Sequence, residues 1–137
     1  MAFLYSNRDR FIIFLIIIVF TTVFYVFYTE IIKNYKIKIS KDNLDIVTNE
    51  LLKEINQCKE NKKSWLFGIS CEQKPTTKVI YDFFNNNKKL TNPHDGSEAL
   101  GGSPGSIQID ILDNLLVLSI DVDANGGIDI EFNIYIN

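Results

Sequence analysis

The sequence has little of what most catalytic and zinc sites are built from. It contains one histidine, His94, and two cysteines, Cys58 and Cys71, among 137 residues. These three cannot supply a four-ligand zinc site, and no G-x-S-x-G motif provides a nucleophile. The glycine-rich stretch at 101–105 lacks the lysine of a phosphate-binding loop. We therefore expect no enzymatic activity.

The chain also lacks a basic field. Its 14 Lys and Arg are outnumbered by 17 Asp and Glu, which gives a net charge of −3. A nucleic-acid-binding surface needs clustered positive charge to neutralise phosphates. We therefore expect no nucleic-acid partner.

Charge, glycine and proline are all missing from one long stretch, Phe11 to Tyr28. As a helix rising about 1.5 Å per residue, this stretch approaches the roughly 30 Å of hydrocarbon in a bilayer. A cleaved signal peptide is the alternative, but no small-residue cleavage site follows Tyr28. We predict a short stub at 1–10 and a retained membrane anchor at 11–28, with the lipid bilayer as the first partner.

The charges that flank the anchor give two opposite indications of topology. Counting Lys and Arg places the C-terminal side in the cytoplasm, because more of them follow the anchor than precede it. Arg8 and Arg10 directly before the anchor, and a cysteine pair beyond it, favour the opposite orientation. We expect a single-pass protein of the inner (cytoplasmic) membrane with its C-terminal domain outside the cytoplasm. The lysines after the anchor are Lys33, Lys36, Lys38 and Lys41.

Beyond the anchor, residues 29–58 show the spacing of an amphipathic helix. Apolar residues recur at steps of three and four, with polar residues between them. Ser40 is a candidate N-cap, so a kink or interruption is expected near it. The predicted buried stripe is Leu44, Val47, Leu51, Leu52 and Ile55.

Residues 59–137 form the predicted small domain of loops and antiparallel sheet. Cys58 and Cys71 are expected to form a disulfide if the domain is exported, and two buried free thiols are the alternative. Thr76 or Thr77 could cap a short helix that ends at 85–87. The turn-rich loop at 91–105 is either a functional surface or flexible. Apolar residues expected to face the core are Trp65, Leu66, Phe67, Val79, Ile80, Phe83 and Phe84.

The last third alternates apolar and polar residues in three runs, at 107–111, 116–122 and 128–136. Turn-forming residues separate the runs, which predicts an antiparallel meander with one apolar face. The fold class is therefore α+β: a transmembrane helix continuing into an amphipathic helix that packs on a C-terminal three-stranded antiparallel meander.

A candidate calcium site lies between the last two runs. Asp121, Asp123, Asn125 and Asp129 place oxygen ligands at alternate positions around Gly126, like the first half of a calcium-binding loop. Phe132 stands where that loop needs a bidentate Glu. The alternative is a hairpin turn built from residues that tolerate left-handed backbone.

This order of elements resembles the type IV pilins and the related pseudopilins. Asn92–Pro93 is similar to the Asn-Pro that often precedes a pilin sheet, and IDVDANGG resembles the late turn of these proteins. Ala2–Phe3 looks like the family's cleavage pair, although Asn7 occupies the fifth mature position, where the family has Glu. A start at Phe11 places Leu15 there instead.

The resemblance implies a structural subunit of a pilus-like filament or pseudopilus, which bundles with copies of itself through its apolar helix. Calcium bound in a late loop is a further implication. The alternative is a single-pass accessory or binding module of a cell-envelope complex, with other subunits as partners and the 91–105 loop as its contact surface.

Overall fold

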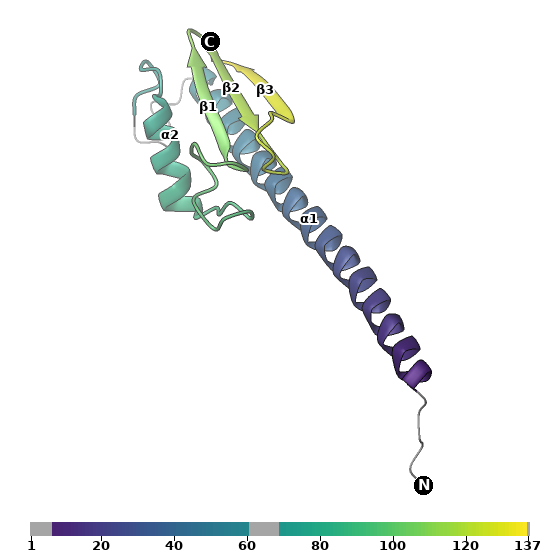
Figure 1. Ribbon diagram of the computed structural model, residues 1–137. Helices are drawn as coiled ribbons and strands as arrows, with labels where there is room; N and C mark the ends of the chain where they lie inside the picture. Colours follow the sequence, from purple (N-terminus) through teal and green to yellow (C-terminus); the bar gives the residue numbers. More distant parts are fainter. Residues whose placement is uncertain (1–6, 61–68, 137) are drawn as a thin grey trace. The chain divides into compact units, whose positions relative to one another are not determined.

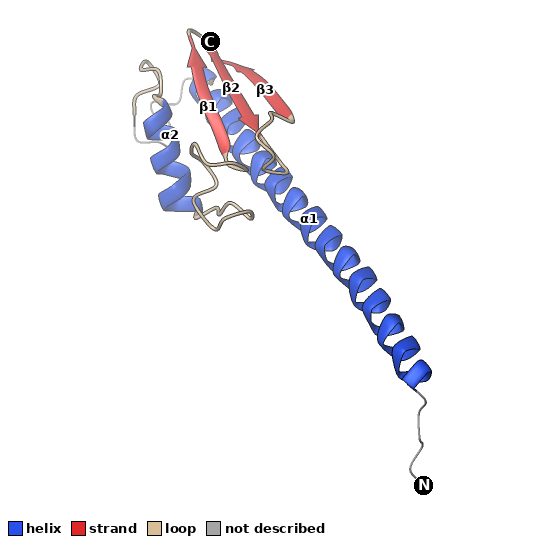
Figure 2. Ribbon diagram, in the orientation of Figure 1, coloured by secondary structure: helices blue, strands red, loops and turns tan. Residues whose placement is uncertain are grey.

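The computed structural model describes residues 7–60 and 69–136 and confirms the α+β architecture (Figures 1 and 2). A long N-terminal helix precedes a three-stranded antiparallel sheet of order β1-β2-β3. The chain forms two compact units, Met1–Tyr35 and Lys36–Asn137. The elements are α1 (Asn7–Lys59), α2 (Thr77–Phe83), a π-helical turn η1 (Phe84–Lys88), β1 (Ile107–Leu112), β2 (Leu115–Ile120) and β3 (Ile130–Tyr135).

The first unit contains a helical segment that is long and apolar enough to cross a membrane. Its large apolar side chains are exposed, from 41% at Ile18 to 71% at Phe24. The hydroxyl groups of Thr21 and Thr22 donate to carbonyls one turn earlier, at 2.9–3.0 Å. Because these bonds lie within the helix, the two polar side chains are satisfied without water.

In the second unit α1 continues without the interruption predicted at Ser40. That prediction is wrong, because Ser40 is a buried residue inside the helix rather than a cap. Leu52 was expected on the buried stripe, but its side chain is 40% exposed. Glu54, which was not expected there, is fully buried together with Leu51 and Ile55. The other predicted stripe residues are buried.

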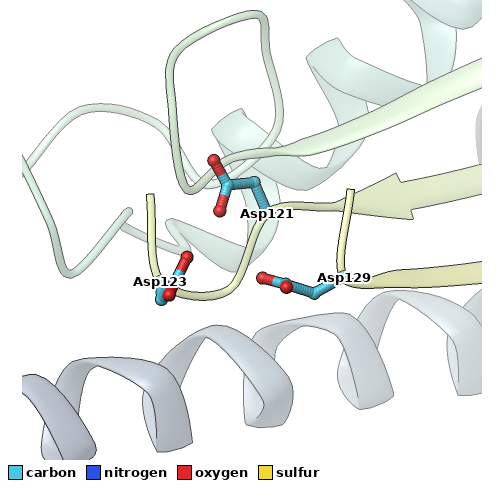
Figure 3. Close-up of side chains that lie close together, drawn as sticks. All are labelled: Asp121, Asp123 and Asp129. Atoms are coloured by element: carbon cyan, nitrogen blue, oxygen red, sulfur yellow. The ribbon is translucent and has the colours of Figure 1, made fainter. Parts of the chain in front are cut away.

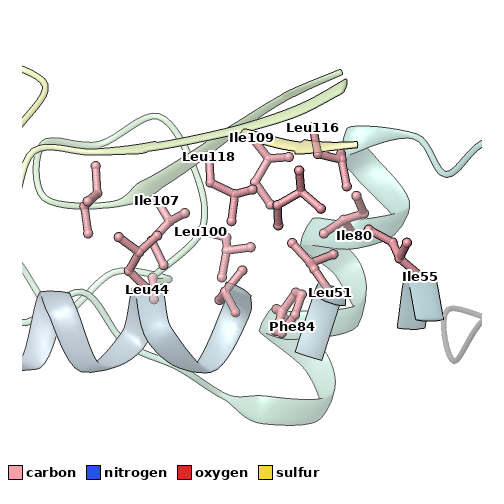
Figure 4. Close-up of a cluster of buried hydrophobic side chains, with 14 of the residues drawn as sticks. Leu44, Leu51, Ile55, Ile80, Phe84, Leu100, Ile107, Ile109, Leu116 and Leu118 are labelled. Atoms are coloured by element: carbon pink, nitrogen blue, oxygen red, sulfur yellow. The ribbon is translucent and has the colours of Figure 1, made fainter. Parts of the chain in front are cut away.

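These α1 residues form a single core with the sheet and with α2 (Figure 4). Leu44, Val47 and Leu51 contribute from α1, while the inward residues of β1 and β2 contribute from the other side. Strand residues at alternate positions share one face, so the predicted apolar runs meet the helix as expected. The sheet members that are fully or almost fully buried are Ile107, Ile109, Leu116, Leu118 and Ile120.

The predicted short helix, α2, is present and is capped as expected. The Thr76 hydroxyl accepts from the Val79 N–H, and Ile80 and Phe84 are buried. The asparagines at 85–87 do not end the helix, because the chain continues through them as η1 until Lys89 adopts a positive φ of 51°. A left-handed residue of this kind is a common helix terminator.

The two edges of the sheet differ from each other, and part of β3 differs from the sequence prediction. The outer edge of β1 is covered: the Ile109 N–H donates to the Tyr81 hydroxyl, and Leu100 bridges Ile107. The free edge of β3 has no strand beside it among the described residues. Ile128 and Phe132 were predicted to face the core, but they are 66% and 41% exposed. Only part of the predicted apolar face of the third run is therefore buried, at Ile134 and Ile136.

A disulfide joins Cys58, near the end of α1, to Cys71, with the Cα atoms 5.4 Å apart. By restricting the unfolded chain, such a loop is worth about 3 kcal/mol on the chain-entropy model. The loop between the cysteines includes residues 61–68, so the expected inward return of Trp65, Leu66 and Phe67 lies outside the described residues. Ala2–Phe3 lies outside them as well.

Candidate cation site between strands two and three

The candidate site occupies the turn that joins β2 to β3. Ile120 and Ile130 are paired at the ends of these strands, and the Asp129 N–H donates to the Ile120 carbonyl at 3.0 Å. Within the turn, Ala124 and Gly126 have φ values of 57° and 97°. Left-handed backbone strongly favours glycine, so Gly126 suits its position while Ala124 is strained there.

The turn brings together three of the four predicted ligands. One carboxylate oxygen from each of Asp121, Asp123 and Asp129 lies within 4.8 Å of the others (Figure 3). The Asn125 amide oxygen accepts from the Gly127 N–H at 2.9 Å, so it stabilises the turn itself. The carboxylates are separated along the chain, and only the path of the turn brings them together.

Backbone N–H groups compensate part of the negative charge. Gly126 and Asn125 donate to Asp121 at 2.6 and 3.1 Å, and Val122 donates to Asp129 at 2.8 Å. Burial raises the pKa of Asp121, but the N–H groups of Gly126 and Asn125 outweigh this effect and hold the pKa below the usual 3.8. The fold therefore favours the ionised carboxylate of Asp121. These hydrogen bonds contribute to folding stability above pH 3.8, and the contribution is lost as the pH falls from there through the lowered pKa of the folded chain.

The spacing of the carboxylates suits a calcium ion. Ca²⁺ binds oxygen at about 2.3–2.6 Å, so two ligands on opposite sides of one ion are about 4.6–5.2 Å apart. The three oxygens are no more than 4.8 Å apart, so one ion could contact all of them. Because a carboxylate has two oxygens and several lone pairs, the backbone hydrogen bonds leave capacity for a cation. The remaining ligands of a calcium ion would come from carbonyl oxygens and water.

His94 connects this turn to α1, which the sequence did not reveal. Its Nε2 lies 2.9 Å from the Val122 carbonyl and 3.3 Å from the Ser40 hydroxyl, and its own carbonyl accepts from Lys36 at 3.4 Å. The sequence alone assigned no contact to His94. The sequence contained one signal for this contact. Ser40 lies one helical turn before Leu44, so it shares the face that was predicted to be buried and needs a polar partner there.

The 91–105 loop is packed against the rest of the unit and is neither a wholly exposed surface nor a free segment. Asn92 is buried, donates to the Pro104 carbonyl at 2.8 Å and accepts from the His94 N–H at 3.0 Å. Asn43 of α1 donates to the Thr91 carbonyl at 2.9 Å. The Asn-Pro pair that carried the pilin resemblance therefore has a structural task here, which is to close the loop.

Comparisons with protein-family models, with curated proteins and with solved structures gave no match. The structure supports only the layout from which that resemblance was inferred: a long apolar N-terminal helix, a three-stranded antiparallel sheet and a disulfide.

Proposed function

We propose that the chain is a membrane-anchored structural subunit that assembles with copies of itself, as in a pilus-like filament or pseudopilus. The observation that supports this is the uncovered apolar surface of α1. None of the most apolar window of the helix is buried by the chain itself. A surface of this kind is unstable in water and has to be covered by lipid or by other helices.

The composition of the segment indicates what drives helix association in lipid and outside it. It has no glycine, alanine or serine, which are the residues that bring helices close together in lipid. Its threonine hydroxyls are used within the helix, so they do not link neighbouring helices. In the bilayer these helices would then associate through packing of their large apolar side chains. Outside lipid, burial against identical helices removes the same surface from water.

A retained anchor with the C-terminal unit outside the cytoplasm agrees with two further features. α1 runs through Tyr28 and Thr29 to Lys59, so a cut after the apolar segment would break a continuous helix. The Cys58–Cys71 disulfide is of the kind that persists in oxidising compartments. Four lysines after the anchor remain an argument for the opposite orientation.

Cysteine cross-linking tests the assembly. A single cysteine replaces Ile16 in the full chain with Cys58 and Cys71 left oxidised, and a thiol cross-linker is added in native membranes. We expect a ladder of dimers and higher oligomers, because the exposed helices contact one another in an assembly. The control is the same chain diluted in detergent, where each copy has its own micelle. Absence of any homo-oligomer in membranes would contradict self-assembly.

A second candidate function, an accessory module of a cell-envelope complex, is favoured by the edge of β3. Its backbone is open among the described residues, and Ile128 and Phe132 are exposed beside it. An open strand edge with apolar side chains can accept a strand from another protein. In the cross-linking experiment, a single adduct of different mass with no ladder would support this alternative over self-assembly.

We also propose that the turn between β2 and β3 binds one calcium ion. Isothermal titration of the oxidised full-length chain in detergent should show one site. Asp121→Asn should weaken binding at least about tenfold, equivalent to about 1.4 kcal/mol, because it removes a charged ligand. Asp110→Asn, on the exposed face of β1, is the matched control and should leave binding unchanged. No heat of binding at millimolar calcium would identify the cluster as a turn only.

A further inference from the structure

The same turn contains a second chemical feature, which needs no cation. Asn125 is followed by Gly126, and this peptide bond is exposed on the surface of the turn. Gly126 has no side chain to shield its backbone nitrogen, so this nitrogen can approach the neighbouring Asn side chain closely. Asn114, also exposed in a turn, is followed by Leu115, whose branched side chain obstructs that approach.

We propose that Asn125 is a self-modifying site, which the fold converts to aspartate or isoaspartate through a succinimide. Two hydrogen bonds support this. The Gly126 N–H donates to the Asp121 carboxylate at 2.6 Å, which places a base on the nitrogen that must act as nucleophile. The Gly127 N–H donates to the Asn125 side-chain oxygen at 2.9 Å, which stabilises negative charge as that oxygen develops it.

The chemistry balances with water as the only co-reactant. The Gly126 nitrogen transfers its proton to Asp121 and forms a bond to the side-chain carbonyl carbon of Asn125. The bond from that carbon to the amide nitrogen then breaks, and this nitrogen leaves as ammonia with the proton returned by Asp121. Water opens either carbonyl of the ring. One opening gives aspartate, and the other gives isoaspartate, in which the main chain runs through the former side chain.

The modification would change the turn in two ways. Either product places a fourth carboxylate beside Asp121, Asp123 and Asp129, which already lie close together. Isoaspartate also lengthens the main chain by one carbon before Gly126, which displaces the N–H that Asp121 accepts. The inference does not depend on the proposed calcium site, because it uses only hydrogen bonds within the chain.

The test follows residue 125 in the oxidised full-length chain, held in detergent at neutral pH with a chelator and heavy-oxygen water. Fragmentation of the peptide that contains residues 125–126 separates aspartate from isoaspartate, and the heavy oxygen dates the conversion to the incubation. The reference is the same chain unfolded in guanidinium chloride. We expect conversion in the folded chain to be roughly tenfold faster or more, as a positioned base allows, while Asn114 remains unchanged.

Two variants separate base catalysis from simple accessibility. Asp121→Asn keeps a hydrogen-bond acceptor but is not basic, so it should slow conversion to the rate of the unfolded chain. Asp110→Asn, which removes a carboxylate from the exposed face of β1 outside the turn, should retain the fast rate. Slower conversion in the folded wild-type chain than in the unfolded chain would overturn the proposal, even if Asp121→Asn fails to fold. An Asp121→Asn chain that folds and converts at the wild-type rate would overturn it too.

Discussion

Replacing both Ile17 and Phe20 with arginine is expected to release the chain from membranes. Each arginine near the centre of a membrane helix costs about 2.5–3.5 kcal/mol, while isoleucine and phenylalanine each contribute about −0.3 to −0.6 kcal/mol. The pair therefore shifts insertion by about 6–8 kcal/mol. Both side chains are more than half exposed, so neither substitution removes packing within the chain. Flotation and carbonate extraction of membranes measure the effect.

The control for this experiment lies on the same helix. Ile46 and Leu52 are about 40% exposed in the C-terminal unit, and their replacement by arginine adds the same charge outside the apolar segment. We expect the control to remain in the membrane fraction after extraction. Retention of the Ile17→Arg, Phe20→Arg chain in that fraction would exclude the segment as the anchor.

Phe84→Ala should produce the largest loss of folding stability among single substitutions in the C-terminal unit. Its side chain is fully buried where α2 passes into η1, and it meets Phe83 edge-to-face with ring centroids 5.2 Å apart. Truncating a buried phenylalanine leaves a cavity and costs about 3–5 kcal/mol. Urea denaturation of the oxidised full-length chain, followed by hydrogen exchange in 107–120, should show a midpoint lower by about 2 M.

Phe132→Ala provides the matched control, because it removes the same atoms from an exposed position on β3. Its cost should be below about 1.5 kcal/mol, since most of the cavity term is absent. Equal effects of the two substitutions would contradict the burial that distinguishes them. A larger effect at Phe132 would indicate that β3 is covered in the assembled protein.

The sequence by itself determined the fold class and the main periodicities. Unbroken apolarity at 11–28 leaves a helix as the means of satisfying the backbone, and alternation after Ile107 requires a sheet with one buried face. Thr76 was identifiable as a cap because its hydroxyl precedes an apolar helical period. The candidate ligands Asp121, Asp123 and Asp129 were also identifiable, since alternate oxygens around a glycine are a local pattern.

Other features depended on contacts between segments that are far apart in the sequence. The spacing places position 54 on the buried face, three residues after Leu51, but a charged side chain gave no reason to expect Glu54 there, and Leu52 was chosen for its apolar side chain alone. Periodicity could not show that Ser40 is a buried helix residue rather than a cap, because the Ser40 hydroxyl meets His94, more than fifty residues later. Alternation alone could not show that Ile128 and Phe132 are exposed while Ile134 and Ile136 of the same run are buried. Local pattern fixes which element a residue joins, whereas tertiary packing decides which side chains it meets.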